Sequence, residues 1–281
     1  MEAAVGASIA GARSLAAMKH VGVNVAADAL LTFAYTGVTG GMVLISADDP
    51  GLHSSQNEQD NRYYAKLAKI AMIEPSDSQE AKDYMIAAME ISEKFDTPVL
   101  MRVTTRICHS KTLVELGERI EVPIVPYEKQ KKYDPIPAVS KMLHKNIEEN
   151  RLVNLRNFSN ETSLNSIEWN GDRKIGIISA GVAYQYAKEV FGDRASYLKI
   201  GFSYPLPMEK IKEFASQVET LYVIEELEPF MEEQIKAAGI SCIGKEKIPQ
   251  IYELNPDILK KVLLGEENPV IEYDASVVAN R

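Results

Sequence analysis

The chain has 281 residues and a formal net charge of −9. This length suits two domains rather than one, and 25% charged with 46% apolar residues is the composition of an ordinary folded protein. The acidic balance argues against nucleic acid or an anionic membrane as the main partner. No apolar run reaches the roughly 18 residues that a membrane span needs, so no membrane segment is expected.

The two cysteines and the apolar start of the chain bear on its cellular location. Cys108 and Cys242 form no CxxC pair, so this chain alone predicts neither an iron–sulfur cluster nor a zinc ribbon. Two reduced thiols suit a cytoplasmic protein.

The start of the chain resembles a signal peptide in composition, but Glu2 stands where the basic region should be. Small residues continue at helical spacing, which predicts a helix over residues 3–12.

The first part of the chain alternates predicted helices and strands. The run GGMVLISADD (40–49) is continuously apolar and ends in two carboxylates, which predicts a buried parallel strand. Ser76 and Asp77 are good helix N-caps, and Glu80 is placed for a capping box. The other predicted elements are a strand at 13–20, a loop at 19–28, a helix at 26–36, an amphipathic segment at 57–75, a helix at 76–95 and a strand at 97–107.

The second part repeats this α/β alternation after a long connector. Residues 109–172 hold four prolines, a basic KQKK run (129–132) that we interpret as a solvated face, and one amphipathic helix near 137–150. The later elements are strands at 174–181, 195–207, 220–229 and 240–245, helices at 182–191, 208–217 and 230–239, and a helix followed by a tail from 258. The order predicts an α/β protein with two doubly wound parallel-sheet domains, at 1–108 and 173–266, joined by a connector at 109–172 and ending in a tail at 267–281.

Three polar clusters follow predicted strands, where parallel sheets bind ligands. They span residues 19–24, 48–62 and 225–229. The second, DDPGLHSSQNEQDNR, mixes amides, hydroxyls, an imidazole and a guanidinium, which suits a polar ligand. A purely structural reading stays open: Ser54 or Ser55 as a helix N-cap, with Glu58 in the first turn.

Several site classes are excluded or disfavoured by spacing. A serine hydrolase needs GxSxG, which is absent. His20, His53, Asp48 and Asp49 are suitable ligand types, but no HxH or HExxH spacing supports a metal site, so none is predicted. The glycines of TGVTGG (36–41) precede a strand rather than open a helix, which argues against a Rossmann dinucleotide site.

Long stretches of the chain resemble one enzyme family. AMKHVGVNVAAD, ADDPGLHSSQNEQDNRYYAK, EPSDSQEAKDY, PVLMRVTTR, IGIISAGVAYQY, LKIGFSYPLP and VIEELEPFMEEQ are similar to the large (alpha) subunit of indolepyruvate:ferredoxin oxidoreductases. The resemblance implies a thiamine-diphosphate enzyme that oxidatively decarboxylates aryl 2-oxo acids to acyl-CoA. It implies a partial pyrimidine-binding domain followed by a transketolase-C-terminal-like domain.

The chain departs from the family pattern at both ends. The family's catalytic glutamate is expected about five residues before Glu2, so the sequence is expected to be a fragment. Five helical residues turn through about 500°, which leaves Glu2 roughly 140° off the required face, so Glu2 is not expected to replace that acid. No GDG-type magnesium motif and no cluster cysteines are found in this sequence. We therefore expect no tight cofactor binding by this chain alone.

The resemblance also implies roles for particular residues. It places Asp48, His53 and Asn57 in the catalytic part of the site and His20, Gly22 and Asn24 on the cofactor side. The loop over the substrate then holds Asp49, Ser54, Gln56 and Arg62. In related pyruvate enzymes an arginine near the position of Asp48 meets the substrate carboxylate. Asp48 is acidic, so either Arg62 or another domain is considered for that contact here.

The resemblance also implies cofactors and partners for the complete enzyme, and one alternative function stays open. The complete enzyme would hold thiamine diphosphate, magnesium and iron–sulfur clusters, and would work with a beta subunit, ferredoxin, the missing alpha-subunit domains, a 2-oxo acid and CoA in the cytoplasm. Association into oligomers is expected, and binding to nucleic acid or membrane is not. The alternative is a non-catalytic assembly or regulatory module that keeps the same two domains, with EELEPFMEEQ as an interface helix start.

Overall fold

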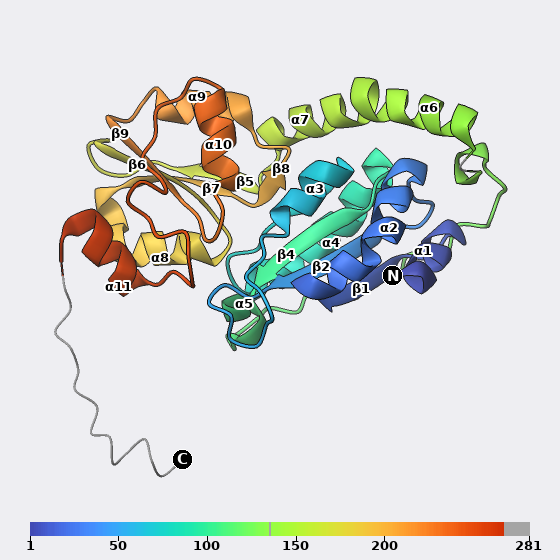
Figure 1. Cartoon of the computed structure of the whole chain (residues 1–281), viewed down its shortest axis with the longest axis horizontal. Helices are drawn as coiled ribbons and strands as arrows, with labels where there is room; N and C mark the ends of the chain where they lie inside the picture. Colours follow the sequence, from blue (N-terminus) through green and yellow to red (C-terminus); the bar gives the residue numbers. More distant parts are fainter. Residues whose placement is uncertain (135, 267–281) are drawn as a thin grey trace, which may run out of the picture.

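The computed structural model describes residues 1–134 and 136–266 as two α/β units joined by a long helix (Figure 1). The first unit is built on a five-stranded sheet of order β1-β2-β4-β3-β8, and the second on a four-stranded sheet of order β5-β7-β6-β9. The strands are β1 (Ser14–Lys19), β2 (Met42–Asp48), β3 (Ala71–Ile73), β4 (Val99–Thr104), β5 (Asn165–Glu168), β6 (Ile175–Ala180), β7 (Ser196–Ile200), β8 (Phe202–Tyr204) and β9 (Thr220–Ile224).

Helices cover both faces of each sheet. They are α1 (Glu2–Ile9), α2 (His20–Thr36), α3 (Arg62–Ala68), α4 (Ser78–Phe95), α5 (Thr105–His109), α6 (Pro137–Asn146), α7 (Leu152–Glu161), α8 (Val182–Phe191), α9 (Met208–Ala215), α10 (Phe230–Ala237) and α11 (Pro256–Leu259). Short 3₁₀ or π turns are η1 (Lys131–Tyr133), η2 (Ile147–Arg151), η3 (Gly192–Arg194) and η4 (Lys260–Leu264). The α/β class predicted from the alternating pattern is confirmed.

The core of the first unit follows the two-residue period of its strands. Leu44, Met72 and Leu100 pack against α2 and α3 on one face of the sheet. The residues next to them in sequence, such as Val43 and Val99, pack against α4 on the other face. A central parallel strand covered on both faces must be apolar at every position, which explains the continuous run in β2.

The two units share one core and one sheet edge. The apolar cluster below α2 and α3 continues without a break into β6, β7, α9 and α10 of the second unit. Strand β8, which directly follows β7 of the second sheet, pairs with β3 of the first sheet in the antiparallel direction. The first sheet is therefore completed by a strand from the later half of the chain.

Several local predictions were wrong in detail. The loop expected at 19–28 is the first two turns of α2, because the helix begins directly at His20. Strand β3 and the antiparallel strands β5 and β8 were not predicted as such, so the sheets are mixed rather than purely parallel. The strand expected at 240–245 is only an isolated bridge between Tyr222 and Ile243. Helix α4 does begin as expected, with the Asp77 carboxylate accepting from the Glu80 N–H at 2.9 Å.

The connector is a strap followed by the long helix. The strap, residues 110–134, runs over the end of the first unit, and the helix from α6 through η2 to α7 arches back to the second unit (Figure 1). The helix thus runs to Glu161, eleven residues beyond the predicted end at 150. The KQKK run is not wholly solvated, since Lys132 Nζ donates to the Val38 carbonyl and to Asp96 Oδ1, both at 2.7 Å. The division of the chain into the four predicted segments stays a prediction, and its tail at 267–281 lies outside the described residues.

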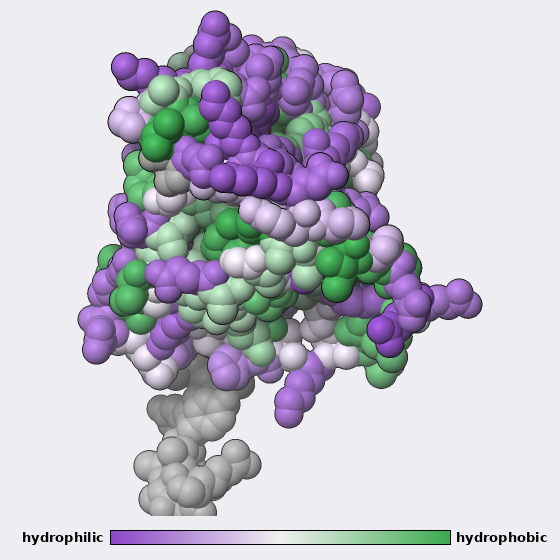
Figure 2. Space-filling view, turned by 90° about the vertical axis from the view of Figure 1, so that its right-hand side faces the viewer, coloured by the Kyte–Doolittle hydropathy of each residue, from purple (hydrophilic) through white to green (hydrophobic). Residues whose placement is uncertain are grey.

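Apolar side chains gather on the surface at the end of the first unit. Figure 2, which looks at the right-hand end of Figure 1, shows green apolar groups in the middle of this end, with hydrophilic ones above them. Within the strap, the exposed large apolar side chains are Leu113, Leu116, Ile120, Val122, Ile124, Val125 and Tyr127. None of the described helices is both long and apolar enough to cross a membrane.

Candidate functional site

The first two polar clusters lie side by side at the carboxyl edge of the first sheet. Strand β1 pairs with β2 so that Lys19 lies beside Ala47, and β2 pairs with β4 so that Asp48 lies beside Thr104. The residues that follow, including His20 and Asp49, therefore meet at one edge. The loop of residues 49–61 starts there and returns to it before α3.

The buried Asp48 links the segments at this edge through hydrogen bonds. The residue is 1% exposed, and its carboxylate accepts from Arg102 Nε at 2.6 Å, from Ser46 Oγ at 3.1 Å and from the Asn61 N–H at 3.0 Å. Burial raises the pKa of Asp48, although the charge of Arg102 acts in the opposite direction. Its oxygens are thus occupied by groups of β2, β4 and the end of the loop.

Asp49 stabilises the first part of the loop through hydrogen bonds. Its carboxylate accepts from the Ser54 N–H at 2.9 Å, from Ser55 Oγ at 2.5 Å and from Thr105 Oγ1 at 2.8 Å, with Lys19 Nζ at 3.6 Å. Burial alone would raise the pKa of Asp49, but these hydrogen bonds and the lysine outweigh it and lower the pKa. The two serines therefore bond to Asp49 and do not cap a helix. Helix α3 begins only at Arg62, so the structural reading of this loop as a helix start was wrong.

His20 is fully buried at the start of α2 and leaves one ring nitrogen free. Its Nε2 lies 3.1 Å from both the backbone oxygen and the side-chain Oδ1 of Asn57. Because both neighbours are acceptors, Nε2 carries the proton in the neutral ring. Nδ1 is then an acceptor, and it has no hydrogen-bond partner within the described residues. Asn61 completes the cluster by donating to the His20 carbonyl at 3.2 Å.

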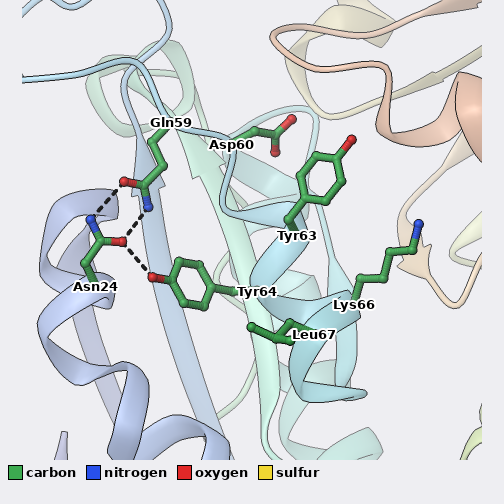
Figure 3. Close-up of a pocket in the computed structure, with 7 residues that line it drawn as sticks. All are labelled: Asn24, Gln59, Asp60, Tyr63, Tyr64, Lys66 and Leu67. Carbon is green, nitrogen blue, oxygen red and sulfur yellow. Dashed lines mark hydrogen bonds between the residues drawn. The ribbon is translucent and has the colours of Figure 1, made fainter.

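A pocket of about 560 Å³ opens beside this cluster, between α2 and α3 (Figure 3). The amides of Asn24 and Gln59 face each other at 2.7 and 2.9 Å, and the Tyr64 hydroxyl donates to Asn24 Oδ1 at 2.7 Å. Asp60 and Tyr63 also line the pocket. Burial, followed by the nearby Glu233 carboxylate, raises the pKa of Tyr63 to about 12, so its phenol stays protonated. Lys66 and Leu67 form the remaining wall.

Arg62 links this edge to the second unit. It is 1% exposed, and its guanidinium donates to Asp60 Oδ2 and to Glu225 Oε2, each at 2.5 Å. It also donates to the carbonyls of Glu226 and Glu228, both at 2.9 Å. Burial alone would lower the pKa of Arg62, but the two carboxylates raise it well above its ordinary value. This guanidinium is fully used inside the protein and does not face a substrate. The third predicted polar cluster thus supplies its partners.

The outer part of the loop is more exposed. His53 Nε2 lies 3.1 Å from Glu253 Oε2, and Glu253 also pairs with Arg106. Glu58 accepts from the Gly51 N–H at 2.6 Å and from the Tyr252 N–H at 3.2 Å. Gln56 is exposed, and Gly22 is half-buried on α2 beside Met18. Among the described residues, neither His53 nor Gln56 forms a hydrogen bond with His20, whereas Asn57, which is also exposed, does.

Sequence reasoning missed two buried charged groups that hold the site, Arg102 and Glu74. Arg102 pairs with Asp48 and, at 2.7 Å through Nη1, with Glu74, and both partners are buried. Glu225 and Glu226 are also buried. A signal was present, because an arginine inside the apolar strand VLMRVT must find a carboxylate partner if that strand is buried. Within the described residues, no group of three or more His, Cys, Asp or Glu side chains is arranged to hold a metal ion.

Comparison with known proteins places this chain in a family. Residues 1–162 match the family model described as pyruvate flavodoxin/ferredoxin oxidoreductase, thiamine diphosphate-binding. Indolepyruvate oxidoreductase subunit IorA of Methanothermobacter thermautotrophicus is 39% identical over 99% of this chain and 47% of its own length. The IorA subunit of Archaeoglobus fulgidus is 44% identical over 90% of this chain and 42% of its own length. The chain thus spans about half the length of these relatives.

Solved structures share the fold at low identity. A 2-oxoglutarate:ferredoxin oxidoreductase from Magnetococcus marinus, with 2-oxoglutarate, coenzyme A and succinyl-CoA bound, aligns with a TM-score of 0.70 and 15% identity, over 92% of this chain and 54% of that one. A split-gene transketolase, an inactive beta4 tetramer, aligns with a TM-score of 0.55 and 13% identity, over 93% of this chain and 75% of that one. From the family model, which matches more than half of its residues, the chain belongs to the thiamine-diphosphate-binding family of pyruvate flavodoxin/ferredoxin oxidoreductases.

Proposed function

We propose that this chain supplies the pyrimidine-binding side of a thiamine diphosphate site in an indolepyruvate:ferredoxin oxidoreductase. The complete enzyme would oxidatively decarboxylate aryl 2-oxo acids to acyl-CoA. The observation that carries the proposal is the cluster of His20, Asn57 and Asn61 at the carboxyl edge of the sheet, within the part of the chain that matches the family model. The relatives named as indolepyruvate oxidoreductase subunits support the aryl substrate.

The residues present fit the ring part of the cofactor. A flat aminopyrimidine needs ring contacts together with hydrogen-bond donors and acceptors. Buried His20 Nδ1 is an unpaired acceptor, and the neighbouring pocket adds the amides of Asn24 and Gln59 and the ring of Tyr64. When bound, thiamine diphosphate supplies a nucleophilic carbon and accepts the electron pair that decarboxylation releases.

Each predicted residue then has a role that its surroundings support. His20, Gly22 and Asn24 lie on the cofactor side, with His20 held in one tautomer by Asn57. Asp48 and Asp49 act by positioning, since their oxygens hold the loop in place. His53, Ser54, Gln56 and Asn57 remain the proposed substrate side of the loop. Arg62 is reassigned from substrate carboxylate to positioning, because its donors bond to Asp60 and Glu225.

The remaining components of the enzyme belong to the same proposal. Magnesium, iron–sulfur clusters, a beta subunit, ferredoxin, CoA and a cytoplasmic location are expected of the complete protein. The coenzyme A and ferredoxin named for the Magnetococcus enzyme are properties of that protein, which shares the fold at 15% identity.

Substitutions in the loop of the complete enzyme test the proposed roles. Asn57→Ala removes one of the two acceptors that fix the His20 tautomer, and His53→Ala removes an exposed imidazole from the substrate side. We expect each to lower the turnover of indolepyruvate, measured as CoA-dependent reduction of an electron acceptor, by about tenfold or more. Asn150→Ala on the exposed helix side is the control and should leave turnover unchanged. Normal turnover in both loop variants would show that the loop assignment is wrong.

Cofactor binding by the chain itself is a second test. The described residues offer ring contacts and hydrogen bonds, but Lys66 is the one cation among the residues that line the pocket between α2 and α3. A diphosphate needs several donors or a bound cation. Titration calorimetry of the 281-residue chain with thiamine diphosphate and magnesium should therefore give weak binding. Binding as tight as that of a complete enzyme of this family would contradict the expectation.

A further inference from the structure

A second pocket shares Lys66 of α3 with the first one and lies where three parts of the molecule meet. It has a volume of about 380 Å³, which is in the range of small-molecule sites. Its walls come from α3 of the first unit, from α7 of the connecting helix, and from β8, α9 and α10 of the second unit. The lining residues are Lys66, Arg156, Asn157, Asn160, Tyr204, Pro205, Leu206, Met208, Glu209 and Gln234.

Two cations of this pocket have no carboxylate partner. Within residues 1–134 and 136–266, neither Lys66 Nζ nor the Arg156 guanidinium forms an ion pair, while many other lysines and arginines of the chain do. Lys66 is placed from α3 by its packing over the Phe230 ring, at 5.9 Å from the ring centre. Figure 3 shows its side chain pointing away from the Asn24–Tyr64 contact, toward the second unit.

The carboxylate in the lining does not neutralise these cations. Glu209 is 73% exposed at its side chain and pairs with Lys212 at 3.1 Å. Asn160 is fully engaged elsewhere, because its Oδ1 caps the start of α9 by accepting from the Glu209 and Lys210 N–H groups at 3.1 and 3.3 Å. Positive charge therefore stays concentrated in one pocket of a chain whose formal net charge is −9.

The floor of the pocket is apolar and ends in a phenol. Tyr204, Pro205, Leu206 and Met208 form it. Burial raises the pKa of Tyr204, and the positive charge of Arg156 acts against that rise. The hydroxyl therefore stays protonated at neutral pH and can donate a hydrogen bond beside the guanidinium.

We propose that this pocket binds the phosphate group of a small organic phosphate, with Lys66 and Arg156 on the phosphate and the organic part on the apolar floor. A phosphate monoester carries close to two negative charges at neutral pH, which matches two unpaired cations, whereas a carboxylate carries one. A guanidinium and an ammonium together supply the forked and the point-charge contacts that phosphate oxygens accept. This inference does not depend on the proposed catalytic function.

Such a ligand would connect segments that otherwise meet only through the core. Lys66 lies on α3, which follows the loop of residues 49–61, and Arg156 lies on α7. A phosphate held by both would tie the loop's helix to the connecting helix and to the second unit. Binding should therefore raise the unfolding temperature of the chain, and it should also release or absorb heat in titration calorimetry.

Titration calorimetry on the 281-residue chain, with phenyl phosphate, inorganic phosphate and benzoate as probes, tests the proposal. We expect phenyl phosphate to bind more tightly than inorganic phosphate, and both more tightly than benzoate. Lys66→Gln and Arg156→Gln should each weaken phenyl phosphate binding by about tenfold, as loss of a charged hydrogen bond predicts. The charge-matched controls are Lys141→Gln and Arg119→Gln, each of which removes one cation outside the pocket.

Four results would overturn the proposal: no binding of either phosphate probe, benzoate binding as tightly as phenyl phosphate, unchanged affinity in both pocket variants, or equal weakening in the controls. Both pocket residues are exposed on helix surfaces, so the variants should fold, and circular dichroism checks this. Tyr204→Phe provides a further variant, which keeps the ring and removes the hydroxyl. It should weaken phenyl phosphate binding less than the loss of either cation does.

Discussion

Arg62 sits at the point where the candidate site and the second unit meet. A single guanidinium there satisfies two buried carboxylates and two carbonyls. Burying such a group costs free energy, but removing it costs more, because its partners are then left buried without a counter-charge. The residue therefore fixes the loop of residues 49–61 against residues 225–228.

Replacing Arg62 should cost far more stability than replacing an exposed arginine. Arg62→Ala leaves Asp60 and Glu225 unpaired, so we expect the free energy of unfolding to fall by about 3–5 kcal/mol. Arg13→Ala is the matched control, since Arg13 forms a two-point contact with Glu93 at 2.8 Å on the surface. It should cost about 0–1 kcal/mol. Urea denaturation measures both, and equal losses would refute the role of burial.

For individual residues, the sequence predicted where polar groups gather but not which of them form pairs. The clusters at 48–62 and 225–229 were both predicted, yet their contact through Arg62 was not. The two residues of the Arg62–Glu225 ion pair are 163 positions apart in the sequence. Periodicity reports local geometry only, so it could not show which carboxylate turns toward which arginine. Arg62 therefore looked available to a substrate when it was not.

At the scale of elements, the strap depends on one glycine at the end of α1. Gly11 has a φ of +92°, and its carbonyl accepts from the Val125 N–H at 3.0 Å. A Cβ on Gly11 would lie 1.8 Å from the Val125 carbonyl oxygen. The strap can therefore approach this turn only because no side chain is present.

Gly11→Ala should release the strap and destabilise the first unit. The backbone strain alone is worth about 1–3 kcal/mol, and displacement of the strap adds to it. Gly6→Ala, inside α1, is the control, because nothing lies within 4 Å of a Cβ there. It should be neutral or stabilise by about 0.5–1 kcal/mol. Thermal unfolding and limited proteolysis of the strap measure the difference, and a strap no more sensitive in Gly11→Ala than in Gly6→Ala would contradict the argument.

The starts of α4, α8, α9 and α10 were predictable, whereas the shortest strands and the start of α2 were not. Helix α4 carries an N-cap and an apolar stripe, and both signals agree. Strand β3 has three residues, too few to show a period, and it is held by pairing with β4 and β8. Helix α2 begins at His20 without a side-chain cap, so the sequence showed no start signal there.

At the scale of the whole molecule, the two units share an apolar core and buried charges. Glu226 lies between them, close enough to Arg102 and Arg62 of the first unit for their charges to act on it. Burial raises the pKa of Glu226 to about 7, and the charge of Arg102 limits that rise. The folded protein therefore binds a proton at Glu226 that an unfolded chain releases at about pH 4.3.

The sign of the pH dependence follows from this raised pKa. Glu226 contributes stability that is present below about pH 4.3 and is lost as the pH rises through about 7. Glu226→Gln removes the titration and keeps an acceptor for the Leu254 N–H, which lies at 3.2 Å. The stability of the variant relative to the natural chain should rise by about 3 kcal/mol between about pH 5 and about pH 8.

Denaturation with urea across this pH range provides the measurement. Glu228→Gln, at an exposed position of the same loop, is the control, and a change of the same size in that variant would show that burial of Glu226 is not the cause. Parallel curves for the natural chain and Glu226→Gln would show that Glu226 does not titrate as described.

Strand β8 sets an order of events during synthesis. The outer edge of β3 is closed only by residues 202–204, which leave the ribosome long after β1 to β4. Until then the nascent first unit presents an open strand edge, and such edges pair readily with other chains. The first unit can reach its final form only once the second sheet is nearly complete, so we expect the two halves to fold poorly when they are made as separate pieces.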